Sequence, residues 1–359
     1  AAASLAACEG PVVKSIPYVV QPEQIIPGVA NYYATAISNG YDFASLLVKT
    51  REGRPIKVES NSLAKANGSV NARVQASVLD LYDSQRISGA SKLGESISWD
   101  TFNNEISQKL EKIKGSNKQV VFLTQTFASP STSKLISEFK KSYGNVNHVV
   151  YDAISESSAA DAYQVRYGRR GLANYDFSKA KVIVSFGADF LGDWQGGGFD
   201  VAYAKGRVPR NGKMSRHIQF ESNMTLSGAN ADKRIPIKPS QLKRALARLY
   251  AKLTGEFVNV TLPPSIESAV DTAAKELLKA GPGAVVLTGV QDVNSQSLVL
   301  QINTLLRSKA FDPKTTILTR QGNDAAVTNL VADMNKGNIG ALIMAGVNPV
   351  YTLPNSEDF

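Results

Sequence analysis

Apolar runs rich in valine and isoleucine alternate with amphipathic segments from about residue 116 onward, and this alternation restricts the possible folds more than any other feature. Examples of such runs are QVVFLTQT (119–126), AKVIVSFGADF (180–190) and AVVLTGV (284–290). Runs that are apolar at every position, rather than at every second one, indicate strands buried on both faces, as in a parallel sheet covered by helices on each side. The pattern therefore predicts an α/β fold with Rossmann-like domains.

The segment before this alternation predicts a small α+β domain over residues 31–115. LLVKTREGRPIKVES (46–60) is typical of a β-hairpin whose polar turn lies at Glu52–Gly53. ISWDTFNNEISQKLEKIKG (97–115) has apolar residues at helical spacing, and we expect a helix with Asp100 as its N-cap and Gly115 at its end.

The two ends of the chain complete this division. Residues 1–30 contain four prolines within GPVVKSIPYVVQPEQIIPG, which favours an extended strap over a helix. Residues 116–359 are expected to form one or more α/β domains. Because the sequence stops soon after the predicted strand IGALIMA, we expect this α/β part to continue beyond Phe359.

Composition excludes several kinds of protein. A single cysteine, Cys8, rules out an internal disulfide and a four-thiolate metal site built from this chain alone. The formal net charge of +9 suits an acidic partner or an anionic membrane surface, but the basic loops lack the aromatic residues expected of a nucleic-acid reader. No apolar run reaches the roughly 18–20 residues that cross a bilayer. We interpret His148 and His217 as structural.

The N-terminal segment indicates export. Leu5-Ala6-Ala7-Cys8 has the pattern of a bacterial lipobox, in which the cysteine is acylated. The alternative is a small-residue coil with an incidental cysteine, since the charged start of a signal peptide is missing. On the first interpretation Cys8 is a lipid attachment site.

Several motifs in the same order resemble one superfamily. They are the hairpin, LYDSQR (81–86), ISWDTF (97–102), GRRGLANYDFSKAKVIVSFGADFLGDW (168–194), SGANADKRIPIKP (227–239) and GVNPVYTLP (346–354). Together they resemble the large subunit of molybdopterin oxidoreductases. More closely, they are similar to the molybdopterin-oxidoreductase-like part of the large iron-sulfur subunit of bacterial alternative complex III.

The resemblance implies a degenerate iron-sulfur site. Relatives carry three cysteines just before the hairpin and a fourth in a following segment, and these positions fall here on Ile37, Gly40, Ala44 and Asn71. None of these side chains ligates iron. Arg73 corresponds to the basic residue between cluster and pterin. We expect no metal here, with the vacated volume filled by side chains such as Tyr41 and Phe43.

The same reasoning predicts an empty pterin site. Open α/β sheets bind dinucleotide-like cofactors at strand ends, and SFGADF (185–190) and AGVNPVY (345–351) are such ends. We expect the cleft between them to hold no pterin, with Gly187 and Gly346 serving turns. The glycines of GDWQGGGFD (192–200) are as typical of turn geometry as of phosphate contact.

The function implied by the resemblance is structural. We expect no catalytic, cofactor-binding or metal-binding residue in this chain. It would be a non-catalytic domain of a quinol-oxidising respiratory complex that transfers electrons to cytochrome c or an oxidase, at the periplasmic face of the bacterial inner membrane. Iron-sulfur clusters and haem c would lie in the rest of the subunit and in partner subunits, beside polytopic quinol-binding membrane subunits. One alternative is an active molybdopterin reductase of oxyanions or sulfur compounds, and another is an exported binding protein.

Overall fold

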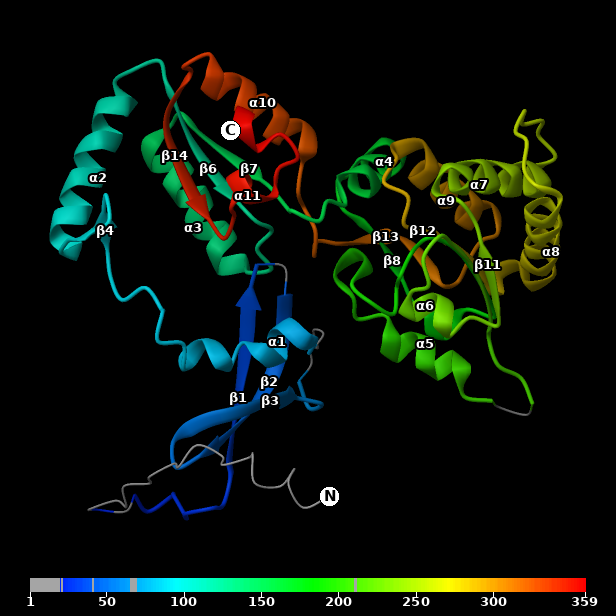
Figure 1. Cartoon of the computed structure of the whole chain (residues 1–359), viewed down its shortest axis with the longest axis horizontal. Helices are drawn as coiled ribbons and strands as arrows, with labels where there is room; N and C mark the ends of the chain where they lie inside the picture. The colour runs from blue at the N-terminus through cyan, green and yellow to red at the C-terminus, as the bar shows by residue number, and fades with distance from the viewer. Residues whose placement is uncertain (1–19, 21, 41, 65–69, 210–211) are drawn as a thin grey trace, which may run out of the picture.

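The computed structural model describes residues 20, 22–40, 42–64, 70–209 and 212–359. Figure 1 shows an antiparallel sheet in blue and two α/β lobes, one above this sheet and one to its right. We call these parts the hairpin domain (31–98), the first lobe (99–150 and 324–359) and the second lobe (157–317). The second lobe is an insertion between two halves of the first.

The hairpin domain is a three-stranded antiparallel meander in the order β1-β2-β3. The predicted hairpin is confirmed, since Glu52 and Gly53 both have positive φ angles, 47° and 76°, as a type I′ turn requires. The sequence did not predict β1, which pairs with β2 along its whole length. The elements are β1 (Asn31–Asn39), β2 (Asp42–Arg51), β3 (Arg54–Ser60), α1 (Ala72–Ala76), η1 (Leu79–Leu81), β4 (Ser91–Lys92) and β5 (Glu95–Ser96).

The first lobe is a parallel sheet in the order β14-β6-β7 with helices on both faces. α2 and α3 pack against one face, and α10 with the C-terminal segment packs against the other. The N-cap of α2 is Ser98 rather than the predicted Asp100, because the Ser98 side chain accepts a hydrogen bond from the Thr101 amide. The elements are α2 (Trp99–Lys114), β6 (Gln119–Thr124), α3 (Pro130–Tyr143), β7 (Val146–Val150), α10 (Asp324–Asn335), β14 (Ile339–Ala345), α11 (Pro349–Thr352) and η5 (Ser356–Asp358).

The second lobe is built on a parallel sheet in the order β11-β10-β9-β12. All five residues of β9 and all five of β12 are buried, so the predicted α/β fold with parallel sheets is confirmed. The elements are α4 (Ser157–Tyr167), β8 (Leu172–Tyr175), η2 (Phe177–Lys179), β9 (Val182–Phe186), η3 (Trp194–Gly196), α5 (Asp200–Arg207), β10 (Arg216–Glu221), α6 (Leu226–Ala229), β11 (Lys233–Pro236), α7 (Pro239–Thr254), α8 (Pro264–Ala280), η4 (Gly281–Gly283), β12 (Ala284–Thr288), α9 (Val293–Leu305) and β13 (Phe311–Ile317).

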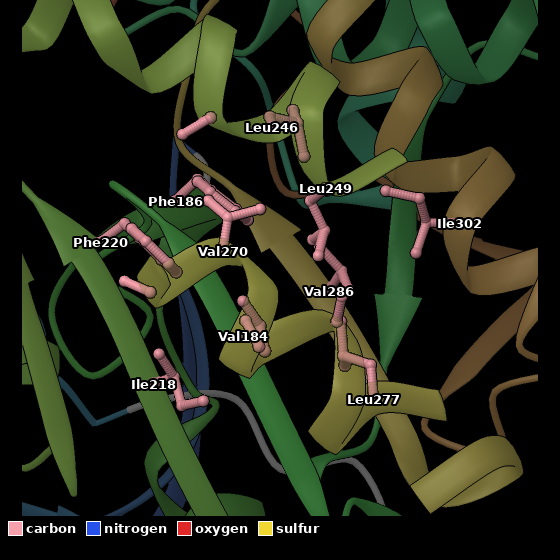
Figure 2. Close-up of a cluster of buried hydrophobic side chains, with 14 of the residues drawn as sticks. Val184, Phe186, Ile218, Phe220, Leu246, Leu249, Val270, Leu277, Val286 and Ile302 are labelled. Atoms are coloured by element: carbon pink, nitrogen blue, oxygen red, sulfur yellow. The ribbon is translucent and has the colours of Figure 1, made fainter. Parts of the chain in front are cut away.

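The two faces of this sheet bury different kinds of side chain. Aliphatic residues of α7 and α8 pack on one face together with the stacked rings of Phe186 and Phe220, whose centroids are 4.6 Å apart. Figure 2 shows this face, with labelled residues from β9, β10 and β12 (Val184, Phe186, Ile218, Phe220, Val286) and from α7, α8 and α9 (Leu246, Leu249, Val270, Leu277, Ile302). The other face is aromatic and supports the loop that follows β9. This second face positions the candidate site.

The chain passes from the first lobe to the second and later returns, and the buried Asp152, which is 3% exposed, bonds to residues next to both passages. Its carboxylate accepts hydrogen bonds from the amide and hydroxyl of Thr126, at 2.8 and 2.6 Å, and from the amides of Gln321 and Gly322, at 3.1 and 2.9 Å. Arg170 of the second lobe donates to the carbonyls of the same returning residues. The outgoing and returning segments are therefore fixed to each other.

Candidate functional site

The four positions that correspond to cluster ligands lie around the tip of the hairpin domain. Ile37 on β1 and Ala44 on β2 are directly opposite each other, and Gly40 lies at the connection between these strands. Asn71 is the N-cap of α1. The side chain of Ala44 is fully buried in an apolar cluster formed with Ile37, Leu46, Val48, Val58, Val70 and Val74. Two of the four positions are thus part of a small hydrophobic core.

Phe43 does not belong to this core, which contradicts the expectation that it fills the vacated volume. Successive residues of a strand point to opposite faces, and on β2 it is Asp42, Ala44 and Leu46 that are buried. Phe43 faces the other way and lines a cavity described below. Valines of α1 and the segment before it fill the volume instead. Tyr41, the second residue expected there, lies outside the described residues.

Gly40 is required by close packing against the first lobe. Its φ of +57° is in the left-handed region, and a Cβ at this position would lie 2.5 Å from the side chain of Gln125. Gln125 also packs against Gly346, where a Cβ would lie 2.4 Å from the amide nitrogen of its side chain. The carbonyl of Gly40 accepts a hydrogen bond from the Ala128 amide at 2.8 Å. Glycine at position 40 therefore has a structural reason that needs no metal.

Both the oxygen and the nitrogen of the Asn71 side-chain amide form hydrogen bonds to other residues of the chain. Its oxygen accepts a hydrogen bond from the Val74 amide at 3.0 Å, and its nitrogen donates to Asp42 Oδ1 at 2.8 Å. The first bond caps α1, and the second ties that helix to β2. Asn71 is thus used as a helix cap and a strand contact.

Arg73 joins the hairpin domain to the second lobe through two aspartates. Its Nε and Nη2 donate to Asp42 at 2.7 and 2.9 Å, in the bidentate geometry that arginine and carboxylate favour. Its Nη1 and Nη2 also donate to Asp193, at 3.3 and 3.0 Å. Asp193 lies 3.6 Å from Nη2 of the buried Arg320. We call Asp42, Asn71, Arg73 and Asp193 the ionic clamp.

The pKa values of the clamp residues follow from these contacts. Burial alone raises the pKa of Asp42, but the hydrogen bonds from Arg73 and Asn71 outweigh it, so that the pKa lies below its usual value. The hydrogen bond to Asp42 raises the pKa of Arg73. Burial lowers this pKa by a smaller amount, and the hydrogen bond to Asp193 raises it further. Both side chains are therefore charged over the physiological range, and each compensates the other.

A glycine-rich loop follows β9 and faces the hairpin domain. Gln195, Gly196, Gly197 and Gly198 all have positive φ angles between 52° and 95°. Gly197 combines φ 74° with ψ −163°, a region that is essentially reserved for glycine. Phe190, fully buried against Phe177, Tyr203 and His217, anchors the beginning of this loop to the aromatic face of the second lobe.

The loop and the hairpin domain enclose a cavity of about 730 Å³. Asp42, Phe43, Ser60 and Val70 contribute from the hairpin side, and the loop contributes residues 195–202. Among the described residues that line this cavity, two are aspartates, Asp42 and Asp200, and none is lysine or arginine. Arg73, next to it, is already bound by two carboxylates.

These residues fit the cofactors of molybdopterin oxidoreductases poorly. A cluster needs thiolates, whereas Ile37 and Ala44 are apolar, Gly40 has no side chain and the Asn71 amide is engaged. A pterin dinucleotide carries phosphates, for which the carboxylates of this cavity are unfavourable and no cation of the described lining compensates. Within the described ranges, no group of three or more histidine, cysteine, aspartate or glutamate residues is arranged to hold a metal ion.

The two strand ends expected to form a pterin cleft belong to different sheets. β9 is in the four-stranded sheet and β14 in the three-stranded one. A Cβ on Gly187 would lie 3.5 Å from Leu242 of α7, whereas Gly346 packs on Gln125. Gly187 and Gly346 do have positive φ angles, which is consistent with turns. The cavity described above lies between the glycine-rich loop and the hairpin domain.

The remaining residues singled out by the sequence have ordinary surroundings or lie outside the structure's description. His217 is fully buried and contacts Tyr203 Oη and Gln219 Oε1, at 3.2 and 3.1 Å. Burial lowers the pKa of His217 to about 4. His148 contacts Thr124 Oγ1 at 2.8 Å. Cys8 lies outside the described residues. In the part of the chain that is described, no helix has the length and apolarity to cross a membrane.

Comparisons with known proteins support the fold assignment. The chain matches no protein-family model. The chain is 23% identical over 326 residues to the molybdopterin-containing subunit ArrA of the arsenate respiratory reductase of Shewanella sp. (strain ANA-3), covering 83% of this chain and 37% of that protein. It superimposes on acetylene hydratase from Pelobacter acetylenicus with a TM-score of 0.54 and 16% identity, covering 75% of this chain and 43% of that structure.

The chain therefore has a mixed α/β fold with parallel sheets, similar to that of acetylene hydratase. Its sequence is weakly similar to that of the molybdopterin-containing subunit of an arsenate respiratory reductase. The chain spans less than half of the length of both relatives.

Proposed function

We propose that this chain is a non-catalytic structural domain of a membrane-attached, quinol-oxidising electron-transfer complex. Its role would be that of the molybdopterin-oxidoreductase-like part of the large iron-sulfur subunit of alternative complex III. The observation that carries this proposal is the ionic clamp. Within it, Asn71, which the resemblance aligns with a cluster ligand, donates a hydrogen bond to Asp42, and the nearby Arg73 donates to both Asp42 and Asp193.

The ionic clamp explains how the residues around the proposed cluster position would be stabilised in a domain that no longer carries a cofactor. In an active relative, the basic residue at position 73 would lie between a cluster and a pterin. Here the charge of Arg73 is balanced by Asp42 and Asp193, and Ile37 and Ala44 pack in a small core. Without a cluster, electrons would have no relay between a pterin and the rest of a complex. The domain would then hold other subunits in register.

One specific observation favours a second function. The match to an arsenate respiratory reductase subunit supports an active molybdopterin oxidoreductase that reduces an oxyanion or a sulfur compound. Such an enzyme would work without the cluster next to its pterin. The acidic lining of the cavity weighs against this alternative.

The proposal also assigns partners and a location. Iron-sulfur clusters and haem c would be held by the remainder of the subunit and by partner subunits, and quinol would be oxidised by polytopic membrane subunits. The domain would face the periplasm of a bacterial inner membrane, with cytochrome c or an oxidase as electron acceptor. The net charge of +9 would favour contact with the anionic lipid surface of that membrane.

Growth of the cells with tungstate in place of molybdate distinguishes the structural function from the reductase function. Cells grown with tungstate in place of molybdate lose molybdenum-dependent activity, and the complex containing this chain is then purified. Under the proposal, its mass, subunit composition and quinol oxidation rate equal those from molybdate-grown cells. A loss of activity in parallel with molybdenum content would contradict the proposal and support the reductase.

Lipid attachment at Cys8 is a separate proposal within this function. An acyl chain contributes about 0.8 kcal/mol per buried methylene, so several chains on one cysteine hold a domain at a membrane surface. The expected result of intact-mass analysis is a chain that begins at an acylated Cys8. An unmodified Cys8 with Ala1 to Ala7 still attached would refute the lipid anchor and leave the structural function untouched.

A further inference from the structure

The hairpin domain contacts the two lobes through interactions of different chemistry. Towards the first lobe, the Gly40 carbonyl accepts a hydrogen bond from the Ala128 amide at 2.8 Å, and a Cβ on Gly40 would lie 2.5 Å from the Gln125 side chain. Towards the second lobe, Arg73 forms an ion pair with Asp193. Figure 1 shows the sheet of the hairpin domain meeting the first lobe at its upper end, with α1 on the side of the second lobe. Salt therefore acts on the second contact much more than on the first.

The ion pair between Arg73 and Asp193 is accessible to water from both sides. The two side chains are 43% and 40% exposed. The Debye length falls from about 10 Å at 0.1 M salt to about 3 Å at 1 M, so that concentrated salt screens such a pair strongly. Exposed ion pairs also contribute little to stability, because water solvates their charges when they separate. This contact can therefore break while the rest of the chain stays folded.

Breaking this ion pair leaves a compensating charge on each side. Arg73 keeps its bidentate hydrogen bonds to Asp42, which belongs to the same hairpin domain. Asp193 keeps its neighbour Arg320, whose Nη2 is 3.6 Å away. The Nη1 of Arg73, which donates to Asp193 at 3.3 Å, becomes hydrated instead. An uncompensated buried charge is the main cost of breaking ion pairs inside proteins, and that cost does not arise here.

The covalent connection between the hairpin domain and the first lobe permits movement. Residues 83–88 follow η1, and all of them are exposed. They belong to no helix or strand. Segments with exposed backbone and few packing contacts change conformation at low cost in free energy. The chain between the two parts therefore offers little resistance to a rotation of one against the other.

We propose that Arg73 and Asp193 form a salt-sensitive latch, and that the hairpin domain rotates about its contact at Gly40 when this latch opens. The cavity of about 730 Å³ lies between the separating surfaces, since Phe43 lines it from the hairpin domain and the glycine-rich loop lines it from the second lobe. Opening therefore widens the cavity to solvent. The contact at Gly40 persists, because its hydrogen bond to Ala128 joins neutral backbone groups.

Distances between spin labels test this motion. In a Cys8→Ser background, Lys57→Cys on β3 and Lys205→Cys on α5 place one nitroxide on the hairpin domain and one on the second lobe, at exposed positions. The matched reference pair combines Lys205→Cys with Lys134→Cys on α3, also exposed, and reports on the two lobes alone. Pulsed electron spin resonance gives the distribution of distances for each pair.

The first measurement varies salt and leaves both latch residues in place. An increase from about 0.05 M to about 1 M NaCl is expected to raise the population of longer distances at least about threefold for the pair at positions 57 and 205, with the reference pair unchanged. Equal distributions at the two salt concentrations would overturn the proposal. A parallel change in the reference pair would also overturn it, because the motion would then lie between the lobes.

The second measurement removes the charge of the latch at low salt. Asp193→Asn keeps the size of the side chain and is expected to give, at about 0.05 M NaCl, the distribution that the unaltered latch gives at about 1 M. The matched control is Asp200→Asn, which removes an exposed carboxylate from the same cavity wall and should leave the distribution unchanged. Circular dichroism verifies that both variants are folded. An unchanged distribution in Asp193→Asn, or equal changes in both variants, would contradict the proposal. This inference does not depend on the proposed function.

Discussion

The hairpin domain and the glycine-rich loop face each other across one cavity, but they differ in what holds them in place. The hairpin site is held by charged and polar contacts among Asp42, Asn71, Arg73 and Asp193. The loop is held by buried rings, with Phe190 packed between Phe177, Tyr203 and His217. In the function we propose, one region has replaced its ligand chemistry, whereas the other has backbone geometry that glycine favours.

If the chain holds no cofactor, as we propose, this difference indicates which features of a cofactor-binding fold persist without the cofactor. Strand ends, turns and aromatic packing are needed for the sheets to close, so the loop keeps its shape. Ligand positions have no such role, and on our proposal they have acquired residues that pack against or bond to their neighbours. Ala44 fills core volume and Asn71 caps a helix. The following predictions test whether the two regions are stabilised as differently as this account requires.

Removal of the Phe190 ring is expected to have the largest effect. Phe190 is fully buried, so that Phe190→Ala leaves a cavity and lowers the free energy of unfolding by about 3–5 kcal/mol. Urea unfolding measures the change. Phe257→Ala is the matched control, since Phe257 is 90% exposed and its loss is expected to cost little. Similar losses of unfolding free energy in the two variants would contradict the claim that buried rings hold the glycine-rich loop in place.

Acid is expected to weaken the loop region before the clamp. The pKa of His217 is about 4 in the folded chain and about 6.5 when unfolded. Between these values only the unfolded chain binds the proton, so the free energy of unfolding falls as pH decreases, by about 1.4 kcal/mol per pH unit and on the order of 3 kcal/mol in total. His217→Gln should flatten the curve of unfolding free energy against pH in this range.

The clamp responds at lower pH, because the folded pKa of Asp42 lies below its usual value. Its contribution is complete above the unfolded pKa near 3.8 and is lost only as pH falls through the lower folded pKa. Asp42→Asn should therefore leave the dependence between pH 4 and 6.5 unchanged. The account would be contradicted if Asp42→Asn abolished the dependence of the unfolding free energy on pH in this range while His217→Gln retained it.

Breaking the clamp is expected to have a moderate effect. Asp42→Ala removes a bidentate partner of Arg73 and should lower the free energy of unfolding by about 1–3 kcal/mol, a range reduced because the Arg73 side chain is 43% exposed. Hydrogen exchange of α1 and the hairpin tip should quicken more than that of the second lobe. Asp80→Ala, an exposed aspartate of η1, is the control. Equal effects would show that the clamp is an ordinary surface pair.

The sequence predicted the elements of the fold well where local patterns decide. The runs around β6, β9 and β12 are apolar at most positions rather than at every second one, and the Glu52–Gly53 turn has a glycine at its second positive φ angle. β1 escaped prediction because its residues do not alternate between apolar and polar, and pairing with β2 holds it in place. The division of strands between sheets was not predictable either, since β14 pairs with β6 across more than 200 residues.

The candidate site was only partly predictable. The four substituted positions could be located by resemblance, and the structure brings Ile37 and Ala44 together. The contacts of the ionic clamp could not be predicted, because Asp193 lies 120 residues from Arg73 and no local pattern connects them. The error over Phe43 came from proximity in sequence, since side chains of adjacent strand residues point to opposite faces.

Metal and pterin analysis of the purified chain tests the central claim most directly. Iron and molybdenum are measured by mass spectrometry, and pterin is measured by the fluorescence of its oxidised form. If the hairpin site is held by its own side chains, the folded chain contains none of the three in stoichiometric amount. An iron-sulfur cluster bound within reach of Ile37, Ala44 and Asn71, or stoichiometric molybdenum with a pterin, would contradict the account.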